Sequence, residues 1–254
     1  MAERDASPAR VRDRLEPGPE VHVSVVMPVF NEAAILAMSV GEVVDGLRSR
    51  GTAFELIVVE NGSTDGTLDL ARSLTVARPE LRVETMPRAD YGLALRHGLL
   101  TATGDIVVNF DCDYYDLGFL DLAVPRVADP AGPAVLVGSK RAPGSDDTRA
   151  LLRRFVTAVF STVLRVGYGL EVSDTHGMKA MRRSDVLAAA SACRLGADLF
   201  DTELILRVQR SGLPIAEIPV AVEERRPART SIMRRVPRTL VGLVRLRRAL
   251  RVRA

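Results

Sequence analysis

The chain has 254 residues, a hydrophobic fraction of 47% and a formal net charge of +3, which suits one large globular domain or two small ones. The near-balanced charge argues against a polyelectrolyte that coats nucleic acid along its whole length. The two cysteines, Cys112 and Cys193, match no zinc or disulfide framework, so we expect a reduced, cytoplasmic compartment. No stretch reaches the roughly 20 apolar residues of a membrane span, and the charged, proline-containing start predicts no signal peptide.

The first half of the chain alternates between strand and helix patterns. After an aperiodic arm at 1–20, β-rich apolar runs alternate with helical stretches as far as residue 113. Asn31 is expected to cap the first helix, and Gly51 to end it. This order predicts βαβ crossovers and a mostly parallel α/β sheet flanked by helices. The predicted strands cover 21–29, 54–59, 81–86 and 106–110, and the predicted helices cover 32–50, a stretch that ends near 78, and 89–103.

Polar and acidic residues follow three of these strands, at 28–32, 60–65 and 111–116. The carboxyl ends of parallel strands share one rim, where α/β folds bind ligands. Asp111 and Asp113 stand one residue apart at this rim, and two carboxylates there suit a hard divalent cation. The alternative is a polar turn, because aspartate is common in turns. Cys112, between the two, is predicted to point into the core.

The second half is less regular and shows no internal repeat. We expect it to complete a single domain that ends in a basic helix. A loop leading into a short strand is predicted over 174–181. The other predicted helices are 117–128, 149–166, 184–192 and 199–210, and the other predicted strands are 134–139 and 215–222.

The C-terminal segment 231–254 has a helical pattern, and from Arg225 onward the chain contains no acid. An apolar stripe among arginines is typical of a helix lying on anionic lipid. The alternative is a helix packed on the domain's own apolar surface, with solvated arginines. Nucleic acid is not an expected partner, because no aromatic residue is interleaved with the arginines. The stripe consists of Leu240, Leu243, Val244, Leu246, Leu250 and Val252.

Four motifs occur in the order and spacing of one known family. They are residues 28–32 (PVFNE), 58–67 (VVENGSTDGT), the small-residue pattern from Gly92 to Asp105, and 111–113 (DCD). Over roughly residues 22–232 the chain resembles family 2 glycosyltransferases of the GT-A fold, and most of all the dolichyl- or polyprenyl-phosphate sugar synthases. The segments 137–141, 174–179, 212–219 and 226–231 are similar to the acceptor half of those synthases.

The resemblance implies an inverting hexosyltransferase that uses a GDP- or UDP-linked sugar donor and Mg²⁺ or Mn²⁺. Asp111 and Asp113 would hold the cation, and Asp113 is therefore counted in the catalytic set. His176 is a candidate third ligand, although a loop histidine is otherwise an ordinary surface residue. Glu60 replaces the family's usual aspartate against the base, which leaves the base open. The implied donor contacts are Pro28, Phe30, Glu32, Glu60, Asn61, Ser63, Asp90, Gly92, Asp111 and Cys112.

The resemblance divides the domain at 21–230 into a nucleotide-sugar half, 21–116, and an acceptor half, 117–230. Asp201 is the candidate general base, although the helix dipole alone favours an acid at this position. A phosphate acceptor is already ionised and would need no base. The phosphate contacts would come from Lys140, Arg141, Arg226, Arg229 and Ser231, whose alternative is a solvated basic surface.

The implied acceptor is a polyprenyl phosphate, met at the inner face of the cell membrane. One alternative is a soluble family 2 enzyme that glycosylates a small metabolite or a natural product. Another is a sugar-nucleotide pyrophosphorylase, but the first strand end lacks the glycine-rich basic loop of that class. A third is a non-catalytic membrane-associated protein. The sequence does not fix the oligomeric state, and a homodimer stays among the expected partners.

Overall fold

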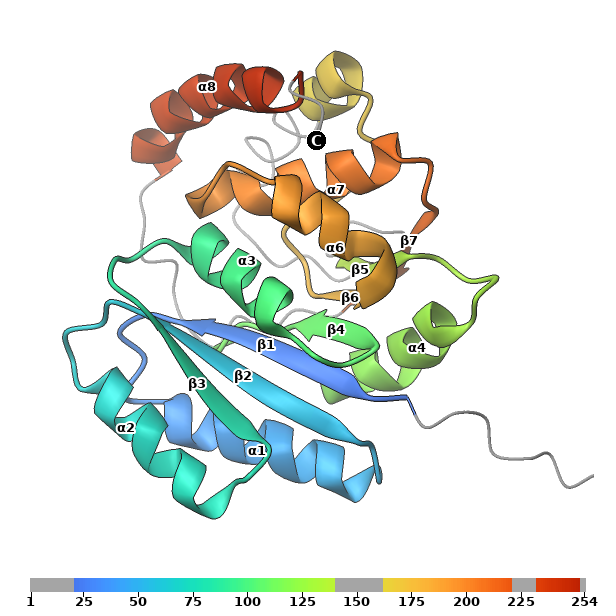
Figure 1. Ribbon diagram of the computed structural model, residues 1–254. Coiled ribbons are helices and arrows are strands. Elements are labelled where there is room, and N and C mark those ends of the chain that lie inside the picture. The colour runs from blue at the N-terminus through green and yellow to red at the C-terminus, as the bar shows by residue number, and fades with distance from the viewer. Residues whose placement is uncertain (1–20, 140–161, 221–231, 252–254) are drawn as a thin grey trace, which may run out of the picture.

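The computed structural model describes residues 21–139, 162–220 and 232–251. Its centre is a seven-stranded sheet in the order β3-β2-β1-β4-β6-β5-β7 (Figure 1). Neighbouring strands among the first four are parallel, so the predicted mostly parallel sheet is confirmed. These strands are β1 (Val23–Val29), β2 (Phe54–Asn61), β3 (Leu81–Met86) and β4 (Ile106–Asn109).

The other three strands extend the sheet beyond β4. β6 (Lys179–Arg182) is antiparallel to both of its neighbours, β4 and β5 (Val135–Ser139). β7 (Ile215–Pro219) pairs in parallel with β5 at the edge. β6, which follows β5 in the chain, therefore lies between β4 and β5, and its side chains are in the middle of the sheet.

Helices cover both faces of the sheet, and each face has its own apolar core. Alternation along β1 feeds both cores, because Val25 and Met27 face one side while Val26 faces the other. The first face carries α1 (Leu36–Ser49), α2 (Thr67–Leu74), η1 (Thr75–Ala77) and α4 (Leu117–Ala128). The second carries α3 (Tyr91–Thr101), α6 (Arg183–Ala192), η2 (Ala197–Leu199), α7 (Phe200–Arg210) and α8 (Ile232–Ala249).

The first helix begins four residues later than predicted, at Leu36 instead of Glu32. Asn31 has a positive φ of 55° and does not cap α1. Its side-chain oxygen instead accepts a hydrogen bond from the N–H of Thr64 at 2.8 Å. The oxygen therefore joins the loops after β1 and β2 instead of binding a helix N–H.

Helix α3 lies directly on the sheet because a glycine faces the strands. A Cβ atom on Gly98 would come within 2.2 Å of Val26 Cγ1 and 3.1 Å of Val59 Cγ2. Any side chain there would push the helix away from β1 and β2. The close approach also fixes the height of the first turn of α3, which reaches the rim at the carboxyl ends of the strands.

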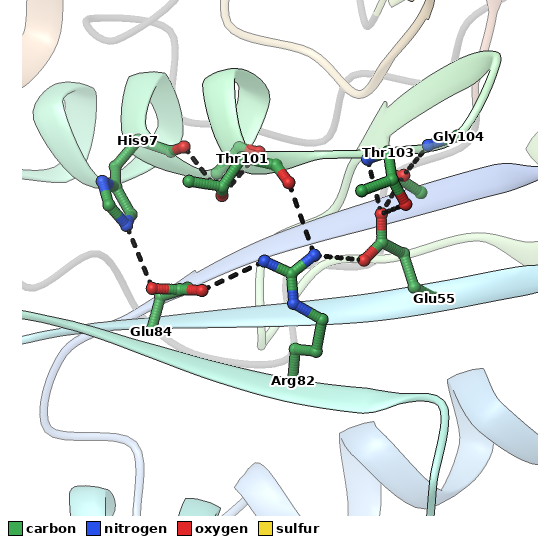
Figure 2. Close-up of polar contacts among 9 residues, drawn as sticks. Glu55, Arg82, Glu84, His97, Thr101, Thr103 and Gly104 are labelled. Atoms are coloured by element: carbon green, nitrogen blue, oxygen red, sulfur yellow. Dashed lines mark hydrogen bonds and ion pairs between the residues drawn. The ribbon is translucent and has the colours of Figure 1, made fainter.

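A polar network ties α3 to the sheet at the opposite rim (Figure 2). The carboxylate of Glu55 accepts hydrogen bonds from Ser24 Oγ at 2.6 Å and from the N–H of Thr103 at 2.7 Å, and it pairs with Arg82 at 2.5 Å. Burial alone would raise the pKa of Glu55, but these hydrogen bonds lower it to about 2. Arg82 also contacts Glu84 at 3.1 Å, so the network staples the α3–β4 loop to the starts of three strands.

The basic C-terminal helix packs on the domain. Leu246 is 0% exposed and Leu243 and Leu250 are partly buried, all in the core that α3 and α7 share. Tyr168 donates a hydrogen bond to the carbonyl of Leu243 at 2.6 Å, and Arg207 donates one to the carbonyl of Ala249 at 2.9 Å. The described part of the predicted lipid-facing stripe is therefore largely turned inward, while Val244 of that stripe is 55% exposed. Of the described helices, none combines the length and apolar character needed to cross a membrane.

Candidate active site

The loops that follow the central strands meet at one rim, as predicted. β1, β2 and β4 are neighbours in the sheet, and hydrogen bonds join the ends of β1 and β2. Asn61 donates from Nδ2 to the carbonyl of Val29 at 2.8 Å, and the N–H of Asn31 donates to Ser63 Oγ at 2.9 Å. These bonds join the loops after β1 and β2 into one polar frame.

Some of the residues predicted to contact the donor are buried or hydrogen-bonded within the loops, and others are exposed at the rim. Glu60 is 3% exposed, and its Oε1 accepts from the N–H of Ser63 at 2.5 Å, which turns its carboxylate into its own loop. The N–H of Glu32 donates to Thr67 Oγ1 at 2.9 Å. Pro28 is buried within β1, whereas the ring of Phe30 is 40% exposed at the strand end. Phe30 therefore offers an apolar face on which a planar base could stack.

Asp90 and Gly92 hold the first turn of α3 against the second half of the chain. Asp90 Oδ1 caps α3 by accepting from the N–H of Leu93 at 2.9 Å, and it also accepts from the N–H of Ala197 at 2.5 Å. A Cβ atom on Gly92 would lie 2.6 Å from Phe200 Cβ. In the structure both residues fix the contact between α3 and the start of α7.

The two acidic residues after β4 sit in a tight turn. The N–H of Asp111 donates to the carbonyl of Tyr114 at 3.0 Å, and the N–H of Tyr114 donates back to the carbonyl of Asp111 at 3.1 Å. Cys112 is 3% exposed and its side chain lies in the core, as the strand pattern predicts. Its carbonyl accepts from Ser39 Oγ at 2.7 Å, which anchors the turn to α1.

Tyr91, at the start of α3, contacts the first of these acids. Its hydroxyl donates to Asp111 Oδ1 at 2.7 Å. Sequence reasoning missed Tyr91, although it stands between Asp90 and Gly92, which were both selected. The only available signal was this position, because a tyrosine at a helix start has no pattern of its own.

Negative charge accumulates around Asp111. Burial raises the pKa of Asp111 to about 6, with further upward contributions from Asp201 and Asp113, while the hydrogen bond from Tyr91 opposes them. Lys179 lies close enough to oppose the rise as well. Asp113 and Asp201 thus both add negative charge at Asp111, and carboxylate oxygens of this kind are ligands that Mg²⁺ or Mn²⁺ takes.

A buried ion pair lies beside this acidic cluster. Lys179 Nζ on β6 contacts Asp201 Oδ1 on α7 at 2.7 Å, with the two residues 1% and 2% exposed. Lys179 also donates to the carbonyl of Gly177 at 2.7 Å. Asp201, the candidate base, is therefore already paired with a cation. Lys179 was assigned no role from the sequence, although a lysine among Met178, Ala180 and Met181 is itself a signal of a buried partner.

The remaining predicted site residues are His176 and the phosphate contacts. His176 is exposed, its N–H donates to Asp174 Oδ1 at 2.9 Å, and its Nδ1 lies 3.1 Å from Thr175 Oγ1. Across 21–139, 162–220 and 232–251, no group of three or more His, Cys, Asp or Glu side chains is arranged to hold a metal. The role of His176 as a third ligand stays a prediction. The predicted phosphate contacts Lys140, Arg141, Arg226, Arg229 and Ser231 all lie outside the described residues.

The fold and rim together define a class of protein. Two solved structures share the fold at identities that speak for the fold alone. The mannosyltransferase PcManGT from Pyrobaculum calidifontis, in complex with GDP-Man and Mn²⁺, has a TM-score of 0.61 at 23% identity, covering 91% of this chain and 66% of that one. Mannosyl-3-phosphoglycerate synthase from Rubrobacter xylanophilus has a TM-score of 0.67 at 20% identity, covering 92% and 76%. The chain has the α/β fold of GT-A glycosyltransferases.

The family follows from sequence comparison. The model of glycosyl transferase family 2 matches residues 24–189, and the chain belongs to this family of enzymes. Glycosyltransferase AglD from Haloferax volcanii is 31% identical over 219 residues, which are 84% of this chain and 35% of that protein. Dolichyl-phosphate beta-glucosyltransferase ALG5A from Trichomonas vaginalis is 24% identical over 224 residues, or 80% and 66%. The chain thus spans about a third of the first relative and about two thirds of the second.

Proposed function

We propose that this glycosyltransferase moves a sugar, with inversion, from a GDP- or UDP-linked donor to a polyprenyl-phosphate-type acceptor. The observation that carries the donor side is the acidic rim. Asp111 and Asp113 follow β4 at the edge where the loops after β1 and β2 also converge. The similarity to a structure that holds GDP-Man and Mn²⁺ supports the same donor class.

In this proposal each rim residue has a physical task. Asp111 and Asp113 would hold Mg²⁺ or Mn²⁺, which neutralises the charge that develops on the departing nucleoside diphosphate. Phe30, at 40% exposure, would stack on the base. Glu60 and Asn61 would keep the β2 loop in shape through Ser63 and Val29.

The buried pair of Asp201 and Lys179 favours a phosphate acceptor over an alcohol. A hydroxyl acceptor needs a base that can take its proton. Taking a proton would neutralise Asp201 and leave the buried Lys179, 2.7 Å away, without its counter-charge. An ionised phosphate needs no proton removed, so the pair can stay intact during transfer. The similarity to a dolichyl-phosphate glucosyltransferase supports this choice.

A soluble acceptor is the second candidate. The fold similarity to mannosyl-3-phosphoglycerate synthase, with a TM-score of 0.67, favours it. With a lipid acceptor, by contrast, the partners would be the donor and the anionic inner face of the cell membrane, where the enzyme would be peripheral. His176 and the phosphate contacts predicted at Lys140, Arg141, Arg226, Arg229 and Ser231 stay part of the proposal on sequence grounds.

Titration calorimetry with UDP and GDP, with and without Mn²⁺, tests the donor side. Wild type is expected to bind one nucleotide in a metal-dependent way, and Asp113→Ala to lose that binding. Asp45→Ala, which removes the same charge from an exposed position on α1, is the matched control. Binding of neither nucleotide under any condition would overturn the proposal. Transfer assays that offer polyprenyl phosphate and 3-phosphoglycerate to the same enzyme then separate the two acceptors.

A further inference from the structure

The docking of α8 fixes which of its faces points outward. Gly242 meets η2, just before α7, so closely that a Cβ atom would lie 2.5 Å from Leu199 Cδ1. Leu246 and Ala249 are buried on the same side, and Arg210 donates to the carbonyl of Leu250 at 3.3 Å. With contacts along its second half, α8 cannot turn its leucines to solvent without leaving the domain.

The outward face combines valines with arginines. Val241 is 54% exposed and Val244 is 55% exposed, and Arg245 and Arg248 are exposed beside them. These residues are spaced i, i+3, i+4 and i+7, so they form one stripe along the helix. Arg247 and Arg251 flank the stripe and are also exposed. No acid interrupts α8, and therefore nothing on the helix itself balances this charge.

A second helical segment, 162–168, extends this face. The hydroxyl of Tyr168 donates to the carbonyl of Leu243, which places the segment against α8. Val166 is 82% exposed, Val163 is 39% exposed, and Arg165 is exposed between them. Figure 1 shows both helices beyond α7, on the side remote from α1 and α2. Two neighbouring helices thus present the same mixture of short apolar side chains and arginine.

We propose that this two-helix face, residues 162–168 and the outward side of 241–251, binds the anionic headgroups of a lipid bilayer. The proposal rests on the proposed function, which places the acceptor in a membrane. Arginines attract an anionic surface, and exposed valines between them can enter the headgroup boundary without a long apolar span. The same residues would not stack on bases, because the outward stripe contains no aromatic side chain.

The packing of α8 on the domain explains why its exposed face differs from the apolar stripe predicted from the sequence. The leucines complete the domain's own core, and a different set of residues on the same helix is left for a partner. The face is separate from the acidic rim, since none of its residues contacts Asp111, Asp113 or Lys179 in the hydrogen bonds and ion pairs of the described part of the chain. Charge changes on the face should therefore leave nucleotide binding intact.

Vesicle flotation tests the proposal with the full chain. We expect the enzyme to float with vesicles of phosphatidylcholine that contain about one quarter phosphatidylglycerol, to stay behind with pure phosphatidylcholine, and to be released by salt. Arg245→Gln/Arg248→Gln should weaken binding to the anionic vesicles at least tenfold. Arg72→Gln/Arg126→Gln removes the same charge from exposed positions on α2 and α4 and should bind like wild type.

Separate readouts distinguish the possible failures. Thermal unfolding and metal-dependent nucleotide binding should be the same in both double variants as in wild type. Equal flotation of both variants, absence of flotation at low salt, or a preference for double-stranded DNA over the anionic vesicles would overturn the lipid assignment while leaving the transferase proposal standing. Conversely, flotation without any metal-dependent nucleotide binding would sink the proposed function and leave the surface in place.

Discussion

Replacing Lys179 by methionine tests how far the fold depends on its buried ion pair. Lys179 and Asp201 are 1% and 2% exposed and 2.7 Å apart, so the substitution leaves a carboxylate without its cation in the interior. Removing one partner of such a pair costs about 3–5 kcal/mol. In a chain of this size the melting temperature should fall by roughly 6–20 °C. Urea unfolding and calorimetry measure both quantities.

The chain supplies a matched control for this experiment. Arg50 and Asp121 are also 2.7 Å apart, but their side chains are 29% and 53% exposed. Arg50→Met should therefore cost less than about 1 kcal/mol. The double variant Lys179→Met/Asp201→Leu should recover most of the lost stability, because no charge is left buried. A Lys179→Met protein as stable as the Arg50→Met protein would refute the reasoning.

Three further predictions concern α3 and its contacts. Tyr91→Phe removes the hydroxyl that donates to Asp111 Oδ1 at 2.7 Å. Calorimetry should then show metal-dependent nucleotide binding weakened about tenfold, an effect of about 1.4 kcal/mol. Unchanged binding would show that the turn alone positions Asp111. The pKa of Glu55 is lowered to about 2, so its ionised carboxylate stabilises the fold by about 3 kcal/mol above pH 4.5, and this contribution is lost as the pH falls from about 4.5 to about 2. Glu55→Gln should be less stable at neutral pH, and its free energy of unfolding, measured in acid titrations, should lack this fall between about pH 4.5 and about pH 2. Gly98→Leu places a Cβ atom 2.2 Å from Val26 Cγ1 and should lower the free energy of unfolding by about 1–3 kcal/mol or more. An unchanged melting temperature would mean that α3 can move off the sheet.

The sequence predicts the first half of the fold well because its signals are local. Strands β1 to β4 alternate with helices along the chain, so apolar runs and their spacing define the elements and their parallel direction. They do not record that β4 pairs with β1 instead of with β3. The start of α1 is a second exception. The side chain of Asn31 bonds to Thr64, more than 30 residues away, and no local pattern records that choice.

The second half and much of the site depend on contacts between distant segments. Nothing in the pattern of 179–182 indicates that this strand lies antiparallel between β4 and β5. Lys179 meets Asp201 only because of that insertion, so the pair was invisible while each residue was read alone. For α8, periodicity predicts an apolar stripe but not the surface it covers, since a lipid and a protein core select the same residues. The roles of the donor, metal and phosphate residues stay predictions.

The carboxylate of Asp90 links the two halves of the rim energetically. One oxygen accepts from Leu93 within α3 and from Ala197 before α7, while the N–H of the same residue donates to Asn61 Oδ1 at 3.0 Å in the β2 loop. Moving the segment before α7 would therefore cost part of the cap of α3 and loosen the β2 loop with it. Any preference that a ligand at the β2 loop has for the observed position of Asp90 therefore favours the observed position of the 196–197 segment, and the linkage is reciprocal.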